Sequence, residues 1–289
     1  EGKPISINSI GIRDENEIII KKEQVFRIVG IGDSVMFGQG VEVQNSYGEI
    51  LEKKLSSLLG GKKIEFINLA VPGYNTTMEV ETFIKKGTIY KPDLVIIGFV
   101  SNDLDMPYFI GKKEDAIFSK KSFLSFYLTK RMETLFTTIG YNPNKAFWRN
   151  KKSDLGLVNL QHALWMNKSL DFIPEEYKFM VGLKAYTREI TNLKKKCDQI
   201  GVPLIIVYDD EMVKNEGYTK NSFVKKLAGK LNIPFVDVFK ESEEFLNKNK
   251  LKLVDLHLSK GDRHPNKKGH LIRGNKLASY IFSNFFPTP

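Results

Sequence analysis

The sequence predicts an α/β protein built on a doubly wound, five-stranded parallel sheet. Five short apolar segments alternate with segments whose apolar residues recur at helical spacing. The third apolar segment, residues 94–100, is the kind of continuous run found in parallel strands that are buried on both faces. Strands that alternate with helices favour a parallel sheet, and right-handed crossovers leave few strand orders. We therefore expect residues 1–289 to form a single domain.

Each element of this sheet can be located in turn. We expect strands at residues 25–31, 64–69, 94–100, 204–208 and 234–238. We expect helices at residues 47–59, 76–86, 175–200, 221–231, 242–249 and 265–286. Thr76 or Thr77 would cap the second helix. Residues 1–24 hold short apolar alternations and predict a small hairpin or strand pair on the domain edge.

The alternation of strands and helices stops between residues 104 and 174. This stretch is rich in aromatic residues, and residues 123–136 within it have the pattern of an amphipathic helix. Long insertions in compact folds are usually functional. We interpret residues 104–174 as a helical, aromatic-rich insertion or cap on the carboxyl edge of the sheet. A helical decoration far from any site is the alternative.

Composition narrows the class of protein. The chain has a net charge of +10, but its lysines are scattered in pairs and triples, without the basic run and interleaved aromatics of a nucleic-acid binder. Cys197 is the single cysteine, which excludes an internal disulfide and a thiolate-rich metal site. No stretch approaches the roughly 18 apolar residues of a membrane span. We expect neither nucleic-acid binding nor stable membrane insertion by this chain.

The most informative stretch is the end of the first strand, where an apolar run gives way to Gly32-Asp33-Ser34. This pattern delivers a serine to the carboxyl edge of the sheet, where open α/β folds bind ligands. The next two strands are followed by Gly73 and Asn102. Ser34 and Gly73 can each offer a backbone N–H, and Asn102 can offer a side-chain N–H. We expect Ser34, Gly73 and Asn102 to form an oxyanion hole.

A serine nucleophile needs a base, and the base is most often histidine. His264 precedes Pro265, which suits the first turn of a helix, so we expect His264 at the N-cap of the last helix. Asp262 lies two residues earlier and can orient the imidazole. The other histidines are His162, which lies in the insertion, His257, and His270, whose expected role is packing or anchoring of the His264 loop. A metal site built from His257, Asp262 and His264 lacks a standard ligand spacing, so we expect none.

Together, Gly32-Asp33-Ser34, Gly73, Ser101-Asn102-Asp103 and Asp262-Arg263-His264-Pro265 follow the order of the four blocks of the SGNH (GDSL-type) hydrolases. The chain resembles this family over residues 25–105 and 200–285. The resemblance implies a flavodoxin-like, three-layer α/β/α domain and a Ser-His-Asp esterase that needs no cofactor. Ser34 would be the nucleophile, His264 the base and Asp262 the orienting acid.

One departure from the family pattern concerns the acid. The usual last block is Asp-x-x-His, but Gly261 stands three residues before His264, so the spacing here is Asp-x-His. If Asp262 points away, then Asp255, Asp209 or Asp210 would be the substitute.

The resemblance leads us to expect a serine esterase that removes a short acyl group, such as acetyl, from a carbohydrate or an envelope polymer. The alternatives are an O-acyltransferase with the same triad, a lipase or lysophospholipase, and a non-enzymatic, carbohydrate-binding pseudo-hydrolase. The stretch from Asn8 to Arg13 is similar to the lead-in of bacterial members that act at the cell envelope, and the chain begins at Glu1. An envelope or secreted location, with a leader or anchor removed, is therefore favoured, and a cytoplasmic location stays open.

Overall fold

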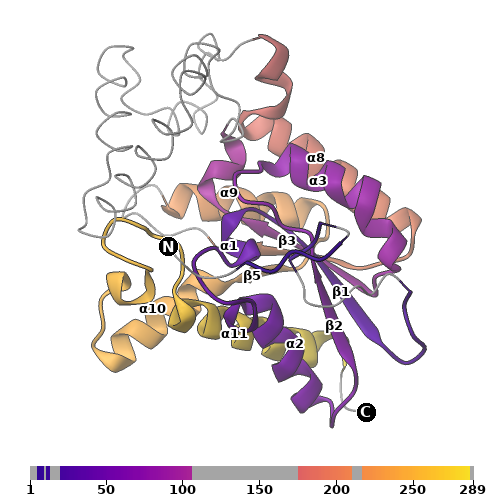
Figure 1. Cartoon of the computed structure of the whole chain (residues 1–289). Coiled ribbons are helices and arrows are strands. Elements are labelled where there is room, and N and C mark those ends of the chain that lie inside the picture. The colour runs from indigo at the N-terminus through magenta and orange to yellow at the C-terminus, as the bar shows by residue number, and fades with distance from the viewer. Residues whose placement is uncertain (1–4, 10, 14–19, 106–174, 210–216, 287–289) are drawn as a thin grey trace, which may run out of the picture.

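The five predicted strands form one parallel sheet. The computed structural model describes residues 5–9, 11–13, 20–105, 175–209 and 217–286 (Figure 1). The strands are β1 (Phe26–Ile31), β2 (Ile64–Asn68), β3 (Leu94–Phe99), β4 (Leu204–Tyr208) and β5 (Phe235–Asp237). Their order is β2-β1-β3-β4-β5, with all neighbouring pairs parallel. This flavodoxin-like order reverses direction between β1 and β3, so ligands are expected at the carboxyl ends of these two strands.

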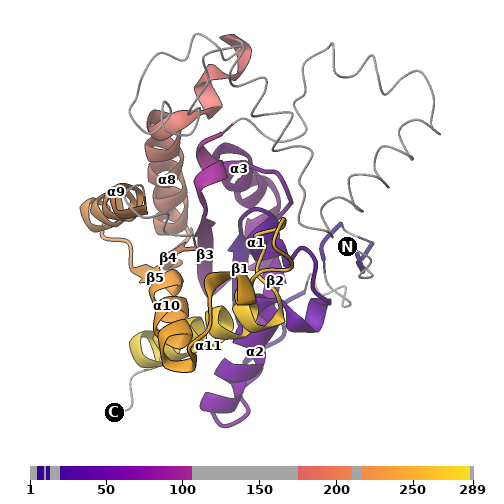
Figure 2. The ribbon, with the colours of Figure 1, turned by 90° about the vertical axis from the view of Figure 1, so that its left-hand side faces the viewer.

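The sheet is covered by helices on both faces (Figures 1 and 2). Alternate side chains of a strand enter opposite layers: on β3, Val95 and Ile97 join one hydrophobic cluster, and Leu94 and Ile96 join the other. The first cluster contains residues of α3 (Thr76–Lys86), α8 (Gly182–Gln199) and α9 (Gly217–Lys230). The second contains residues of α1 (Ser34–Phe37), α2 (Tyr47–Leu58) and α11 (Lys267–Phe285). The predicted three-layer α/β/α architecture is therefore confirmed.

Several helix boundaries differ from the sequence prediction because polar side chains cap them. Asn75, rather than Thr76 or Thr77, is the N-cap of α3, and its side chain accepts from the N–H of Met78 at 3.3 Å. Asp237 caps α10 (Val238–Asn249), which therefore begins four residues before the predicted start. A short 3-10 helix, Glu175–Met180, occupies the predicted start of α8.

The last helix also begins later than predicted. Asn266 is its N-cap and accepts from the N–H groups of Lys268 and Gly269. Pro265 instead forms a single antiparallel bridge with His257. His264 therefore lies in the loop before the cap, and the prediction that it is itself the N-cap was wrong.

Two predicted segments lie wholly or partly outside the described residues. The insertion at 104–174 is described only at its first two positions. In the N-terminal segment, residues 5–9, 11–13 and 20–24 contain no strand, so the predicted hairpin is not found in the parts that are described. Within the described ranges, no helix combines the length and apolar character needed to cross a membrane.

Candidate active site

The serine predicted as nucleophile begins the short helix α1. Asp33 is the N-cap of this helix, and its Oδ1 accepts from the N–H of Val35 at 2.8 Å. Ser34 occupies the first helical position, where a backbone N–H has no acceptor within the helix. Gly38 ends the helix in the left-handed conformation, with φ of +81°. The turn thus holds Ser34 at the carboxyl end of β1 with its own N–H available to a ligand.

His264 reaches this serine from the other end of the chain. Its Nε2 lies 2.8 Å from Ser34 Oγ, although 230 residues separate the two in sequence. Ser34 Oγ also lies 3.1 Å from Asp33 Oδ2. A hydroxyl has one hydrogen, so it donates to one of these acceptors at a time. Donation to the closer acceptor, His264, is the arrangement that general-base activation requires.

Asp262 lies on the far side of the imidazole from the serine. Its Oδ1 is 2.6 Å from His264 Nδ1 and accepts from the backbone N–H of His264 at 3.0 Å. Burial by itself would raise the pKa of Asp262, but the hydrogen bonds and charge of His264 outweigh it and hold the pKa below its usual value of 3.8. An ionised Asp262 fixes the tautomer with hydrogen on Nδ1, which leaves Nε2 free to accept from Ser34.

The alternative acids have other partners. Asp255 Oδ2 accepts from the N–H of Lys252 at 2.8 Å, and buried Asp209 forms an ion pair with Arg273 at 2.5 Å. Asp210 lies outside the described residues. Among the candidates that are described, Asp262 is the one in contact with the ring of His264.

Gly73 lies in the loop after β2, and Asn102 lies in the short 3-10 helix Ser101–Leu104 that follows β3. Gly73 has a φ of +81°, and its loop is held to the Ser34 turn because the N–H of Val71 donates to the carbonyl of Gly32 at 3.0 Å. The Nδ2 of Asn102 donates to Asp33 Oδ2 at 2.9 Å. Because that amide nitrogen carries two hydrogens, Asp33 can orient it with one and leave the other for a ligand.

Two acidic residues near the site, Asp33 and Glu79, carry no signal in the sequence pattern that marks them as part of it. Asp33 joins three groups at the site: the hydroxyl of Ser34, the N–H of Val35 and the amide of Asn102. An aspartate just before a helix is a recognisable N-cap signal. Glu79, on α3, is only 1% exposed, and its two carboxyl oxygens make no hydrogen bond within the described part of the chain. Burial, with a smaller contribution from the charge of Asp33, raises the pKa of Glu79 well above its usual value.

His270 and His257 have contacts elsewhere in the fold. His270 is fully buried and packs against Tyr47, with 5.9 Å between ring centroids, which agrees with its expected packing role. His257 takes part in the bridge to Pro265, and His162 lies outside the described residues. Within the described ranges, no group of three or more His, Cys, Asp or Glu side chains is arranged to hold a metal ion.

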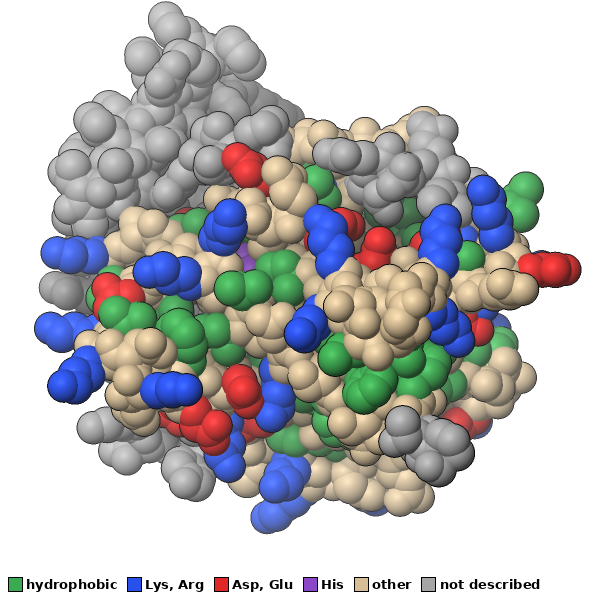
Figure 3. Space-filling view, turned by 90° about the horizontal axis from the view of Figure 1, so that it is seen from below, with side chains coloured by type: hydrophobic (Ala, Val, Ile, Leu, Met, Phe, Trp, Pro, Cys, Tyr) green, Lys and Arg blue, Asp and Glu red, His purple; other side chains and the backbone are tan. Residues whose placement is uncertain are grey.

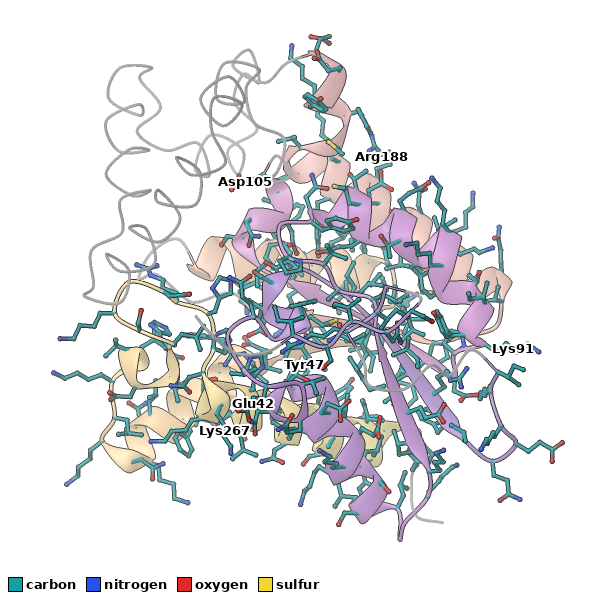
Figure 4. The ribbon with its side chains drawn as sticks, in the orientation of Figure 1. Glu42, Tyr47, Lys91, Asp105, Arg188 and Lys267 are labelled. Atoms are coloured by element: carbon teal, nitrogen blue, oxygen red, sulfur yellow. The ribbon has the colours of Figure 1, made fainter. Side chains whose placement is uncertain are left out.

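A groove of about 610 Å³ begins beside the Gly73 loop. Its lining includes Tyr74 from the Gly73 loop and Met78 from the first turn of α3, and Phe179, Met180 and Arg188 from the other side. The amide of Asn75 ties these walls to the loop after β3, because it donates to the carbonyls of Asp105 and Met180 at 3.0 and 2.9 Å. Asp105 and Arg188 accordingly lie toward the same end of the molecule, away from Lys91 (Figure 4).

On the face seen in Figure 3, lysine and arginine side chains are spread among acidic and hydrophobic ones. This distribution follows the scattered lysines of the sequence.

Solved structures with this fold include esterases. A catalytic mutant of the acetylxylan esterase Axe2 from Geobacillus stearothermophilus superposes with a TM-score of 0.55 at 15% identity, covering 94% of this chain and 100% of that one. A lipolytic protein of the G-D-S-L family from Desulfitobacterium hafniense gives 0.50 at 15% identity, covering 88% and 98%. LAE5, an α/β hydrolase from the metagenome of Lake Arreo, gives 0.53 at 14% identity, covering 88% and 94%. These similarities concern the fold.

Sequence comparison establishes the family. No curated protein sequence gives a significant match. The family model for the GDSL-like lipase/acylhydrolase family, however, matches residues 31–272, which include the Ser34 turn, both intervening loops and the loop that carries Asp262 and His264. The chain is therefore a member of the GDSL-like lipase/acylhydrolase family and a serine hydrolase that acts on ester bonds.

Proposed function

We propose that the protein hydrolyses short-chain carboxylic esters, such as O-acetyl groups on a carbohydrate, through Ser34, His264 and Asp262. The observation that supports this most is the 2.8 Å separation of Ser34 Oγ and His264 Nε2, with Asp262 2.6 Å from the opposite ring nitrogen. In the Axe2 enzyme, the catalytic mutants with this fold replace a serine, an aspartate and a histidine.

In the proposed reaction, Ser34 Oγ attacks the ester carbonyl carbon while His264 Nε2 takes the hydroxyl proton. The resulting oxyanion accepts hydrogen bonds from the backbone N–H groups of Ser34 and Gly73 and from the second amide hydrogen of Asn102. When the tetrahedral intermediate collapses, the ester C–O bond breaks and His264 returns its proton to the leaving alcohol. Asp262 stays ionised and stabilises the imidazolium.

Water then releases the acyl group. It attacks the acyl-enzyme carbonyl while His264 again accepts a proton, and the second collapse returns that proton to Ser34 Oγ and frees the carboxylic acid.

The same intermediate would serve an O-acyltransferase, since only the acceptor differs. Incubation with an activated acetyl ester, with and without an oligosaccharide acceptor, separates the two: hydrolysis releases acetate in both, whereas transfer yields an acetylated oligosaccharide.

The groove beside Gly73 supports a carbohydrate as the part of the substrate that carries the ester. Tyr74 and Phe179 offer aromatic faces, and polar side chains of Thr77 and Arg188 lie among them. Aromatic faces and convergent polar groups are the combination expected of a pocket that orients a polar ligand.

Steady-state hydrolysis of p-nitrophenyl acetate and of an acetylated xylooligosaccharide tests this proposal. Tyr74→Ala and Phe179→Ala should lower kcat/KM for the oligosaccharide by about tenfold while leaving p-nitrophenyl acetate nearly unchanged, because each removes one apolar contact. Ile89→Ala is the matched control, since Ile89 is an exposed apolar residue outside the groove. Equal effects of all three variants on both esters would count against a carbohydrate in this groove, and a p-nitrophenyl series from acetyl to palmitoyl would define the acyl length.

A further inference from the structure

Arg13 is a buried cation at the edge of the proposed site, although it comes from the N-terminal segment. Its side chain is only 3% exposed. A compact turn presents it: the N–H groups of Gly11 and Ile12 donate to Asn8, and Gly11 adopts a φ of +81°. Ile12 is buried in the core cluster on the α3 face, so the segment is anchored just before the arginine. In Figure 2 the described N-terminal residues lie next to α1.

The guanidinium of Arg13 binds the end of the nucleophile helix. Nη1 donates to the carbonyls of Phe37 and of Gly38, the latter at 2.6 Å, and Nη2 donates to the carbonyl of Val41 at 2.5 Å. The guanidinium carbon also lies 4.7 Å from the centre of the Phe37 ring. Helix ends leave carbonyls without intrahelical partners, and a buried carbonyl without a donor is costly. Arg13 therefore donates hydrogen bonds to backbone carbonyls at and just after the end of α1.

The same turn also contacts the loop of the proposed base. Gly40 has a φ of +82°, and a Cβ at this position would lie only 2.1 Å from Leu258 Cδ1, so Leu258 packs directly on its backbone. The N–H of Leu258 in turn donates to the carbonyl of His264 at 2.9 Å. A continuous series of contacts thus leads from Arg13, through the turn at residues 37–41 and Leu258, to His264.

We propose that Arg13 is a positioning residue: it locks the turn that follows Ser34 against the loop of His264 and so sets the distance between serine and base. This inference rests on the proposed function, because it assigns Arg13 a role in the Ser34–His264 pair. A displacement of about 1 Å between reacting groups can lower a rate by about a hundredfold. Arg13 acts through the turn and does not touch the reacting atoms.

The test compares kcat, KM and the rate of fluorophosphonate labelling for Arg13→Met, Arg13→Lys and Lys21→Met. Lys21→Met is the matched control, because Lys21 also belongs to the N-terminal segment but pairs with Asp93 at the amino end of β3. We expect Arg13→Met to lower kcat and the labelling rate by about ten- to a hundredfold with little change in KM. Arg13→Lys should retain more activity, and millimolar guanidinium should partly restore Arg13→Met, while Lys21→Met keeps wild-type kcat.

A structural role alone would give a different result. Loss of thermal stability in Arg13→Met, with wild-type kcat for the folded fraction and no guanidinium rescue, would overturn the proposal. If Arg13→Met does not fold, Arg13→Lys, Leu258→Ala and their double variant decide the question. If Arg13 and Leu258 act through the same contacts, the rate loss of the double variant should be smaller than the product of the two single losses. A double variant whose loss equals that product would contradict the proposal. Ser34→Ala distinguishes failure of the proposed function from failure of the Arg13 role. If Ser34→Ala stays active, the proposed function fails. If Ser34→Ala is inactive but Arg13→Met is fully active, only the Arg13 role is overturned.

Discussion

The Nδ1 atom of His264 lies 2.6 Å from Oδ1 of Asp262, and the backbone N–H of His264 donates to the same oxygen at 3.0 Å. The carboxylate two residues earlier therefore holds both the ring and the backbone of the histidine. In this geometry the Asp-x-His spacing brings the proposed acid to the proposed base, in a loop that precedes the helix cap.

Replacing this acid should remove most of the activity. Asp262→Asn keeps the size of the side chain, but its amide can donate to Nδ1 and favour the tautomer that leaves Nε2 unable to accept from Ser34. We expect kcat for p-nitrophenyl acetate to fall by about 10³–10⁴-fold. Asp255→Asn is the matched control, because Asp255 caps a short 3-10 helix and its side chain makes no contact with His264 in the structure. Comparable losses in both variants would argue against Asp262 as the orienting acid.

Asn102 should contribute to the transition state more than to binding. Asn102→Ala removes the amide that Asp33 orients, so the oxyanion loses one donor. We expect kcat to fall by about 10²–10³-fold with a smaller change in KM. The measurement is steady-state kinetics with p-nitrophenyl acetate, and a variant that raises KM without lowering kcat would place Asn102 in substrate binding instead.

Glu79 should make stability fall with rising pH. Its pKa in the folded protein is raised, so between its ordinary value of 4.5 and the folded value the native state holds one proton more than the unfolded state. In that range its contribution to the free energy of unfolding decreases by about 1.4 kcal/mol per pH unit. Glu79→Gln should remove this dependence and be more stable than wild type at neutral pH. Urea unfolding at several pH values checks it, and parallel curves for the two proteins would show that Glu79 is not protonated in the native state.

His270 should have the opposite effect. Burial first, and then the charges of Arg273, Arg13 and His264, lower its pKa well below 6.5. Below pH 6.5 the unfolded state therefore binds a proton at this residue that the native state does not bind, so the free energy of unfolding decreases as the pH falls. His270→Phe keeps a ring beside Tyr47 and should weaken this acid sensitivity. Thermal melts from pH 5 to pH 8 measure it, and an unchanged pH dependence would contradict a neutral His270.

The strands could be predicted from the sequence because each is a short, mostly apolar run, and the first of them gives way abruptly to Gly32-Asp33-Ser34. The position of Ser34 followed from the same pattern, and Asn102 and Gly73 followed from the ends of the next two strands. The first residues of the helices were harder to predict, because they depend on which polar side chain accepts a hydrogen bond from the N–H groups of the first turn. Asn266 and Asn75 did so in place of His264 and the neighbouring threonines.

Contacts between distant segments could not be read from the pattern. Arg13 follows short apolar alternations, but an arginine in such a segment is normally expected to face solvent. Its partners at residues 37–41 are backbone carbonyls, which carry no sequence signal. Glu79 lies where a helix presents one face to the sheet, and a carboxylate there is normally expected to face solvent. Only the folded arrangement brings it near Asp33.

The assignment of Ser34 as the nucleophile is tested most directly by mass spectrometry of the protein after reaction with a fluorophosphonate, together with hydrolysis of p-nitrophenyl acetate by wild type and Ser34→Ala. We expect one adduct, on the peptide that contains Ser34, and loss of both adduct and esterase activity in Ser34→Ala. An adduct on another residue, or a folded Ser34→Ala variant that hydrolyses the ester at the wild-type rate, would contradict it.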